Sequence, residues 1–224
     1  MNQDMSIKKN LDIQLYEMFC QEIIQGHWVQ GQIINADNLA EAFGVSRTPV
    51  VHALKRMLAN EMICVTKTGH YYVPTFTEKQ VCDLVGVRAL LEREAITEME
   101  RNGIKIDFDT LRRLSQDCLT YNQEEEQIKT RQTDLDLHSF LVGQSGNQCL
   151  SNLFAKVQGQ FIVANYLLTT HTKEQQEVAA DDHIRLLDAL EAGDYDRARA
   201  ISDEHIYSAR DKILAKMRYN QHSA

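Results

Sequence analysis

The chain has 224 residues, 43% of them apolar, with 2 prolines and 10 glycines, which leaves room for two domains and favours helix over long coil. No apolar run approaches the ~18 residues that cross a membrane, and the first ten residues lack the apolar stretch of a secretory signal. Five cysteines without a CxxC pair indicate free thiols, so the sequence predicts a cytoplasmic protein without a membrane partner, not a disulfide-bonded secreted one. The net charge of −8 argues against nucleic-acid binding if it is taken over the whole chain.

The charge is unevenly distributed along the sequence. Residues 1–75 carry six Lys/Arg and seven Asp/Glu, whereas residues 76–224 carry 18 and 25. Within residues 46–70, four basic side chains stand against one acidic side chain, Glu61. This local positive charge is modest, so phosphate binding would also need a dimer and backbone N–H groups.

The first predicted helix covers about residues 7–25, where apolar residues recur at helical spacing. Two glycines in GHWVQG, residues 26–31, end this helix, and Trp28 is expected to be buried. The two isoleucines that follow lead into Asn35–Asn38, which is expected to cap the next helix.

Residues 39–58, LAEAFGVSRTPVVHALKRML, predict two short helices joined by a tight turn. Gly44 ends the first helix by permitting a left-handed backbone. Ser46 is the expected N-cap of the second, with its hydroxyl taking up a free backbone N–H, and Pro49 falls in the first turn, where its missing N–H costs nothing. One face of the second helix forms a buried stripe of Val50, Leu54, Met57 and Leu58. This is the layout of a helix-turn-helix, in which the second helix reads DNA.

After Asn60 the pattern changes to period two. Residues 62–65 and 71–73 predict two short strands around a turn that contains Gly69. A helix, a helix-turn-helix and a hairpin together make a winged helix. The sequence therefore predicts a winged helix-turn-helix DNA-binding domain over residues 1–75.

Beyond residue 76 the strand signals stop and long amphipathic helices follow. We expect six of them, at about 78–101, 107–129, 132–144, 147–171, 173–192 and 194–217. Three polar residues suit the N-terminal caps of these helices, namely Thr77, Asp107 and Asp194. Three glycines are expected at helix ends, namely Gly103, Gly146 and Gly193. The predicted fold is mainly α, with an all-α helical bundle over residues 76–224 after the winged helix.

Three histidines of this bundle fall on inward-facing sides of three different helices. Asp134 and His138 are four residues apart and share a face, while His183 and His205 each lie one turn from apolar residues. A single interior histidine is usually satisfied by a carbonyl or a carboxylate. Three of them beside an aspartate are also typical of a metal site with nitrogen and oxygen ligands. Spacing alone leaves the metal site and separate buried histidines as equal alternatives.

The N-terminal part resembles the GntR family of bacterial transcription regulators. The matching residues are Ile24, Gly26, Gly31, LAEAFGVSRTPV at 39–50, Ala53, Leu54 and Gly69. The C-terminal part resembles the all-helical ligand-sensing domain of that family's FadR-type (FCD) branch. The match there runs through VRALLE at 87–92, D-x-x-x-H at 134–138, SGN at 145–147, His183 with LLDAL at 186–190, and His205. Six C-terminal helices resemble the shorter, VanR-like subgroup.

In that family an aspartate and three histidines bind a divalent metal such as zinc or nickel, and the metal takes the carboxylate of a small effector. The resemblance implies that the ligands here are Asp134, His138, His183 and His205. Arg88 matches an arginine that faces the family's ligand cavity, which implies effector binding. The alternative, a surface salt bridge between Arg88 and Glu92 one turn on, stays equally open.

The reading helix departs from the family pattern. Relatives usually have SRTPVREAL, whereas this chain has SRTPVVHAL, so Val51 and His52 replace an arginine and a glutamate. Asp37 also stands where many relatives carry an arginine. Val51 is expected to pack against a thymine methyl, which implies A·T pairs at that place in the operator. Arg47 is the candidate guanine contact, Ser46 and Thr48 are candidates for phosphate, and Gly69 would let the wing approach the minor groove. The full expected set is Ser46, Arg47, Thr48, Val51, His52, Lys55 and Gly69.

Together these features predict a transcriptional regulator, not an enzyme. It would bind a near-palindromic DNA operator as a homodimer and respond to a small carboxylate bound at the metal. Two alternatives remain. In the first, the bundle serves only for dimerisation and the histidines are structural. In the second, the metal acts in catalysis on an organic acid, although no further interior carboxylate or nucleophile pattern accompanies it.

Overall fold

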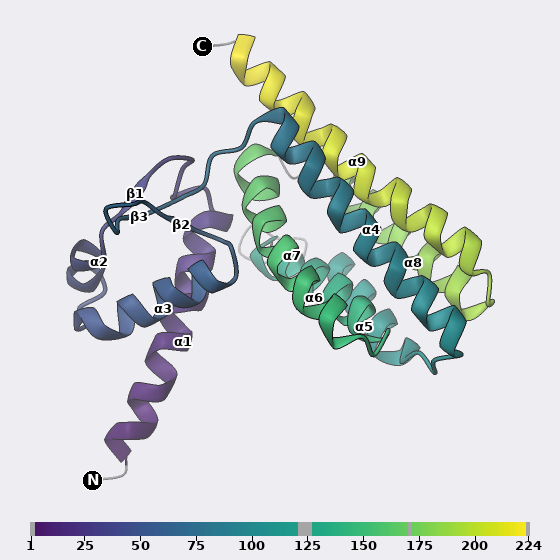
Figure 1. Ribbon diagram of the computed structural model, residues 1–224, viewed down its shortest axis with the longest axis horizontal. Helices are drawn as coiled ribbons and strands as arrows, with labels where there is room; N and C mark the ends of the chain where they lie inside the picture. The colour runs from purple at the N-terminus through teal and green to yellow at the C-terminus, as the bar shows by residue number, and fades with distance from the viewer. Residues whose placement is uncertain (1–2, 121–126, 170–171, 223–224) are drawn as a thin grey trace. The chain divides into compact units, whose positions relative to one another are not determined.

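The computed structural model describes residues 3–120, 127–169 and 172–222 (Figure 1). The chain divides into two compact units, one made of residues 1–76 with 162–167, the other of the remaining residues. The described residues are mainly helical, as predicted, and carry a small antiparallel sheet. None of their helices is long and apolar enough to cross a membrane.

The N-terminal unit contains three helices, namely α1 (Gln3–Ile24), α2 (Ala36–Ala42) and α3 (Arg47–Ala59). Helix α1 packs against α3, and α2 and α3 form the predicted helix-turn-helix. The ring of Phe19 lies at the centre of this packing, with its centroid 5.6 Å from those of both Trp28 and Phe43. Phe19 and Trp28 are buried, so these aromatic contacts form the core of the unit.

Asn35 begins α2 in the way that the sequence predicted. Its side-chain oxygen accepts hydrogen bonds from the backbone N–H groups of Asp37 and Asn38, at 2.8 and 3.2 Å. Gly44 follows α2 with a φ of +63°, the left-handed conformation expected there. Both ends of α2 therefore depend on the residue types that marked them in the sequence.

The residue predicted to cap α3 is in the predicted position, but the predicted capping hydrogen bond is not formed. Ser46 occupies the N-cap position with an extended backbone, but its hydroxyl makes no capping hydrogen bond. Such a hydroxyl normally accepts from the second or third N–H of the helix, and the third residue of α3 is Pro49, which has no N–H. In the stripe along α3, Leu58 is half-buried, whereas the other three members, Val50, Leu54 and Met57, are fully buried.

The wing is shorter than predicted but gains a strand. The sheet has the order β1-β3-β2, all antiparallel, with β1 (Ile33–Ile34), β2 (Cys64–Val65) and β3 (Tyr71–Tyr72). The sequence predicted the β2–β3 hairpin, with Gly69 in its turn at a φ of +85°. It did not predict β1, because two residues are too few for a period-two pattern.

Six helices follow residue 76 within the described part of the chain, as predicted. They are α4 (Glu78–Asn102), α5 (Phe108–Thr120), α6 (Gln127–Gly143), α7 (Gln148–Leu168), α8 (Lys173–Glu191) and α9 (Tyr195–His222). The predicted break between a helix over 107–129 and another from 132 is wrong, because α6 already begins at Gln127, and α9 runs past the predicted end at 217 to His222. Two of the predicted helices also extend over residues 121–126 and 170–171, which lie outside the described residues.

The predicted caps fix where these helices begin. Thr77 and Gln80 form a reciprocal capping box at the start of α4, and Gly103 ends that helix in a left-handed conformation. The carboxylates of Asp107 and Asp194 accept backbone hydrogen bonds three residues on, at the starts of α5 and α9. Thr77, Gly103, Asp107 and Asp194 were predicted in these places, whereas the part of Gln80 in the capping box was not.

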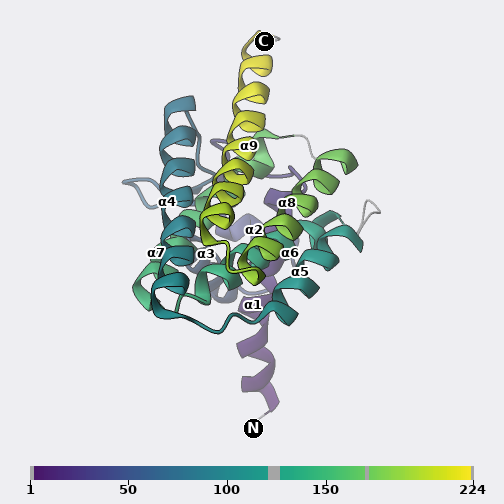
Figure 2. The same ribbon diagram turned by 90° about the vertical axis from the view of Figure 1, so that its right-hand side faces the viewer.

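The six helices pack around one apolar core. Helices α4 and α9 lie side by side (Figures 1 and 2), α8 also packs against α9, and α5 packs against α6 and α8. The core draws residues from all six helices and includes Ile96, Met99, Leu111, Leu137, Leu141, Phe154, Leu187 and Ile201. This packing turns the inner faces of α4, α6, α8 and α9 toward a common interior, where the polar residues described next are found.

Candidate functional site

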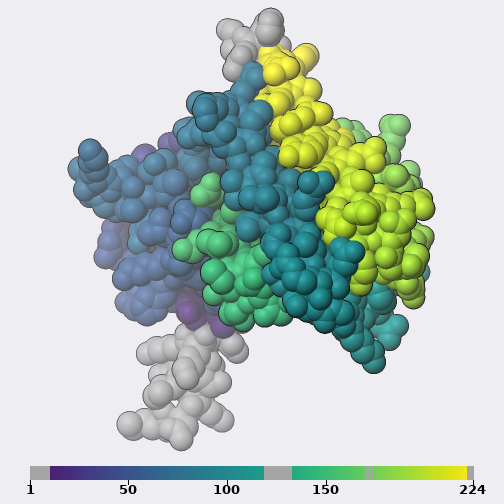
Figure 3. Space-filling model, turned by 45° about the vertical axis from the view of Figure 1, so that its right-hand side comes forward, coloured from purple at the N-terminus to yellow at the C-terminus, as the bar shows by residue number. Residues whose placement is uncertain are grey.

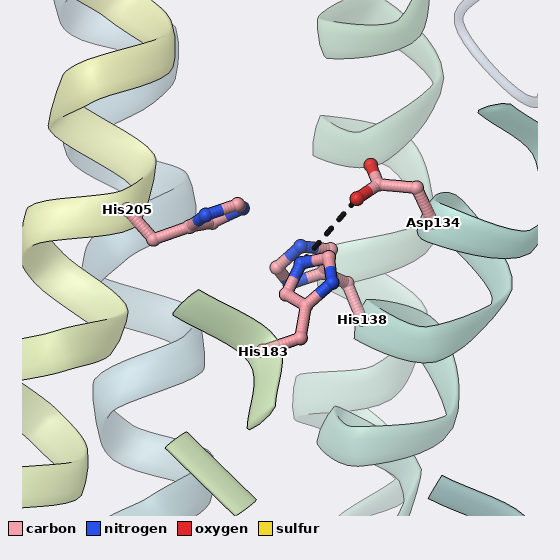
Figure 4. Close-up of side chains that lie close together, drawn as sticks. All are labelled: Asp134, His138, His183 and His205. Atoms are coloured by element: carbon pink, nitrogen blue, oxygen red, sulfur yellow. Dashed lines mark ion pairs between the residues drawn. The ribbon is translucent and has the colours of Figure 1, made fainter. Parts of the chain in front are cut away.

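The aspartate and three histidines singled out by their spacing meet inside the C-terminal unit. Asp134 and His138 project from α6, His183 from α8 and His205 from α9, and Figure 4 shows their side chains pointing toward one another. One possible ligand atom from each residue lies within 4.8 Å of the other three. We call these four residues the Asp–His cluster.

The cluster is tightly packed and largely removed from solvent. The ring centroids of His138 and His183 are 5.1 Å apart, those of His138 and His205 5.2 Å, and those of His183 and His205 4.7 Å. His138 and His183 are each 1% exposed, whereas Asp134 and His205 are half-buried. Buried ring nitrogens need hydrogen-bond or metal partners inside the protein, because bulk water does not reach them.

Two of the histidines are oriented by carboxylates outside the cluster. His138 Nδ1 lies 3.0 Å from Glu92 Oε2, and His205 Nδ1 lies 3.4 Å from Asp182 Oδ2. In both rings this leaves Nε2 as the nitrogen not used by a carboxylate. The Nε2 atom of His138 is buried and has no hydrogen-bond partner among the described residues. This is the usual arrangement around a metal-binding imidazole.

His183 has no such outer partner. Both of its ring nitrogens are buried without a hydrogen bond within the described part of the chain, and its Nε2 lies 3.3 Å from Asp134 Oδ1. Burial, with a smaller contribution from the repulsion of His205, lowers the pKa of His183 to about 3. The imidazole is therefore neutral at pH 7, the form in which histidine binds metals.

The aspartate of the cluster remains ionised. Burial alone would raise the pKa of Asp134, but the three neighbouring histidines and Arg88 together hold it below its usual range. The cluster thus offers one carboxylate and three imidazoles, the donor set that suits zinc and nickel. Ligand nitrogens around a tetrahedral zinc lie roughly 3.4 Å apart, so small side-chain movements would bring the four atoms onto an ion. These residues fit a divalent metal.

Arg88 lies in the same interior, on α4. Its side chain is 2% exposed, and its Nε donates to Glu92 Oε1 at 2.9 Å. The ion pair with Glu92 that the spacing suggested does form, but it is not on the surface. The guanidinium carbon stands 4.1 Å from the ring centroid of Phe161 and 6.0 Å from that of Phe154. A buried arginine held in this way is placed to bind a ligand inside the bundle and not at its surface.

Three polar residues next to the cluster were not among the site residues expected from the sequence. Glu92 and Asp182 orient two of the histidines, and Gln158 is 4% exposed with its Nε2 3.4 Å from the carbonyl oxygen of Leu135, next to Asp134. The Oε1 atom of Gln158 is buried without a partner among the described residues. Glu92 was visible in the sequence one turn after Arg88, but nothing in the spacing of Asp182 or Gln158 distinguished them from other polar helix residues.

The residues expected to contact DNA lie mostly on the surface of the N-terminal unit. All except Val51, which is half-buried, are exposed, namely Ser46, Arg47, Thr48, His52, Lys55 and Gly69. Arg47 Nε lies 2.8 Å from Asp37 Oδ1. Because both side chains are exposed, this ion pair is worth at most about 1 kcal/mol and leaves Arg47 able to exchange partners.

Two family models match the chain. The FCD domain model matches residues 83–208, and the model described as bacterial regulatory proteins, gntR family, matches residues 12–73. The two matches follow one another in the order that the sequence motifs predicted. The first covers the described cluster and the second the winged helix.

Two curated relatives are transcriptional regulators. The Nta operon transcriptional regulator of Aminobacter aminovorans is 24% identical over 195 residues, which cover 86% of this chain and 89% of that protein. The gluconate operon transcriptional repressor of Bacillus subtilis (strain 168) is 32% identical over 89 residues, 40% of this chain and 35% of that protein.

Solved structures share the fold over nearly the whole chain. E. coli McbR/YncC superposes with a TM-score of 0.74 at 20% identity, covering 92% of this chain and 98% of that one. A putative transcriptional regulator GntR from Rhodococcus sp. RHA1 has a TM-score of 0.72 at 17% identity, with coverages of 91% and 97%. The metalloenzyme alternative is set aside, because the matched family and the curated relatives are regulators. This chain belongs to the GntR family of bacterial regulatory proteins, in the branch that carries an FCD domain, and is a transcriptional regulator and not an enzyme.

Proposed function

We propose that this regulator senses a small carboxylate effector at a divalent metal ion, zinc or nickel, held by the Asp–His cluster. Residues 1–75 bind a near-palindromic operator in the cytoplasm, and residues 76–224 bind the effector and form the homodimer. The observation that carries the proposal is the convergence of four possible ligand atoms within 4.8 Å, including buried imidazole nitrogens without another partner.

The charges of the bundle interior favour an anionic effector. The carboxylate of Asp134 would leave a divalent ion with a single net positive charge. When bound, the ion supplies a Lewis-acidic centre for a carboxylate oxygen. The charge of Arg88 is balanced by its partner Glu92, but the guanidinium also offers N–H groups that suit a carboxylate. Effector binding would shift the packing of the helices and alter the placement of the two reading helices, with a typical coupling of ~1–3 kcal/mol.

The surface of α3 and the wing supply the DNA contacts in this proposal. Arg47 reads a guanine, and the exposed Ser46, Thr48, His52 and Lys55 contact phosphates or base edges. Ser46 is available for this role because its hydroxyl makes no capping hydrogen bond. Gly69 lets the wing come close to the minor groove.

Val51 gives the operator an expected signature. A half-buried valine on the reading helix offers a methyl-bearing surface that fits a thymine methyl, so A·T pairs are expected where the family's usual arginine would act. Selection of bound sequences from a random DNA pool measures this directly. Recovery of the family's usual operator, unchanged, would contradict the role given to Val51.

Exposed apolar residues on the bundle support the homodimer. Val87 and Leu90 on α4 are 46% and 63% exposed, and Leu153 on α7 is 52% exposed. Figure 3 shows a face of the molecule on which α4 and α7 lie side by side, and Arg88 contacts Phe154 and Phe161 between them. A stable interface buries about 800 Å² on each partner, for which such a face is suited.

A thermal-shift screen of carboxylic acids, with and without Zn²⁺ or Ni²⁺, tests the sensor on protein without a histidine tag. A true effector at 100 times its Kd stabilises the fold by about 2.7 kcal/mol, and we expect this only when metal is present.

His183→Ala should lose metal binding and the effector response but keep operator binding in a gel-shift assay. His27→Ala, at an exposed position of the N-terminal unit, is the control. A normal effector response of His183→Ala would show that the cluster has no sensing role.

A second candidate function is a purely structural metal site in a dimerisation bundle. Four protein ligands complete the tetrahedral shell of a structural zinc, which needs no effector. Metal analysis separates the two: stoichiometric metal without any carboxylate response supports the structural site.

A further inference from the structure

We infer that Glu92 is the positioning residue that couples Arg88 to the metal centre, because one buried carboxylate fixes the orientation of both Arg88 and His138. The inference rests on the proposed metal-dependent sensing. It gives Glu92 a role beside the four ligands and not as one of them.

Each oxygen of the Glu92 carboxylate has partners. Oε1 accepts from Arg88 Nε at 2.9 Å, while Oε2 lies 3.0 Å from His138 Nδ1 and accepts from the Ser202 hydroxyl at 3.3 Å. The Glu92 side chain is 0% exposed, so no water competes for these oxygens. Helices α4, α6 and α9 therefore meet at a single carboxylate.

This contact determines which nitrogen His138 presents to the cluster. The Glu92 carboxylate is paired with the Arg88 guanidinium and also accepts from the Ser202 hydroxyl, so both of its oxygens act as acceptors here. An ionised carboxylate only accepts hydrogen bonds, and the Nδ1 of His138 must therefore donate. Its Nε2 is then the nitrogen left for the cluster, buried and without a hydrogen-bond partner in the described part of the chain. A metal-binding imidazole needs this tautomer.

The same carboxylate orients Arg88. Because Glu92 engages Nε, the guanidinium is held against Phe161, with its carbon 4.1 Å from the ring centroid. Its two Nη groups are the other donors of the guanidinium, and their fork-like geometry suits a carboxylate. A movement of Arg88 toward an effector changes its bond to Glu92, and Glu92 passes that change to His138 across one further hydrogen bond.

Glu92→Gln tests the inference with zinc and acetate as probes. The amide keeps the shape of the side chain but has one donor end, so it cannot accept from both Arg88 and His138. We expect the Kd for zinc to rise 10–100-fold, measured by competition with a chromophoric chelator. The affinity of the zinc-loaded protein for acetate should fall as well. Glu94→Gln, on the same helix with a side chain 46% exposed, makes the same charge change and should leave both values unaltered.

The tautomer of His138 can be measured directly, and it would not depend on Glu92 if Glu92 had only a structural role. Long-range ¹H–¹⁵N spectra of ¹⁵N-histidine-labelled protein should show His138 with its proton on Nδ1 in the wild type, and should lose that preference in Glu92→Gln. If Glu92→Gln does not fold, the double variant Arg88→Met/Glu92→Leu removes both buried charges together. Proteins tolerate this better than the loss of one charge of a buried pair. The zinc affinity of the double variant should still fall at least tenfold.

The possible outcomes separate this inference from the proposed function. A wild-type protein that binds no zinc would overturn the metal centre and the role of Glu92 together. A wild type that binds zinc, with variants that bind it equally well, would overturn the role of Glu92 alone. A loss of zinc affinity in Glu92→Gln without a loss of acetate affinity would overturn the link to Arg88.

Discussion

Asp37, the second residue of α2, and Arg47, the first of α3, form an exposed ion pair with 2.8 Å between the paired oxygen and nitrogen. The carboxylate stands where the family pattern has an arginine, so this chain places a negative charge beside its main candidate for reading a guanine. DNA phosphates are repelled by that charge, while the ion pair itself costs little to break. The reading surface is therefore less attractive to DNA than the sequence of α3 alone suggests.

Asp37→Asn should strengthen operator binding several-fold, or about 1 kcal/mol, because it removes one negative charge and frees Arg47. Binding isotherms over a range of salt concentrations, on an operator recovered by selection, measure the change. Glu41→Gln, an equally exposed acid one turn further along α2, is the matched control. If both variants bind alike, the effect comes from net charge and not from the pairing with Arg47.

The residues of the candidate site were predictable to different degrees. Helical periodicity placed His138, His183 and His205 on inward faces, and the structure brings them into one cluster with Asp134. The contact between His138 and Glu92 could not be predicted, since 46 residues separate them along the chain and only the packing of α4 on α6 joins them. Metal binding by the cluster stays a prediction.

Helix boundaries were predicted well where a capping residue marks them, since capping is a local property, but not at the start of α6 (Gln127, predicted 132) or the end of α9 (His222, predicted 217). Thr77, Gly103 and Asp107 act as the sequence predicted because each makes its bonds within a few residues. Capping failed at Ser46, where the partner N–H is missing in Pro49. The strand β1 was missed because only its pairing with β3, about 40 residues on, makes it a strand.

Thr77→Ala should destabilise the C-terminal unit by about 1 kcal/mol, because it removes one half of the capping box of α4. Chemical denaturation followed by circular dichroism gives the change in the free energy of unfolding. Thr97→Ala is the matched control on the same helix, where the hydroxyl only bonds back to the carbonyl of Arg93, at 2.9 Å. An equal loss in both variants would mean that the capping box contributes nothing beyond helix propensity.

At the scale of the whole molecule, the net charge of −8 does not by itself indicate a DNA-binding protein. The motifs of residues 39–58 and 134–205 identified the family, whereas composition pointed away from nucleic acid. The assignment of residues 1–75 and 76–224 to separate functions remains a proposal. In the proposed homodimer, affinity for DNA would come from two weak reading surfaces acting together, so we expect operator binding to depend on dimerisation.

Leu90→Glu should weaken the dimer and lower operator affinity at least tenfold, because the residue is 63% exposed on the face proposed to meet a second copy. Light scattering after gel filtration measures the oligomeric state, and gel shift measures the affinity. Val178→Glu, at an apolar position on α8 that is 51% exposed, is the control. A Leu90→Glu protein that stays dimeric would place the interface elsewhere.

The Asp–His cluster draws on helices that are far apart along the chain, since 45 residues separate His138 from His183 and 22 separate His183 from His205. The unfolded chain would have to close these two loops before the site exists, which is a slow and entropically costly way to capture an ion. Only Asp134 and His138 are close enough in sequence to hold a metal beforehand. We therefore expect the bundle to fold before the proposed ion binds, so that the native protein could take up and release the metal without unfolding as a whole.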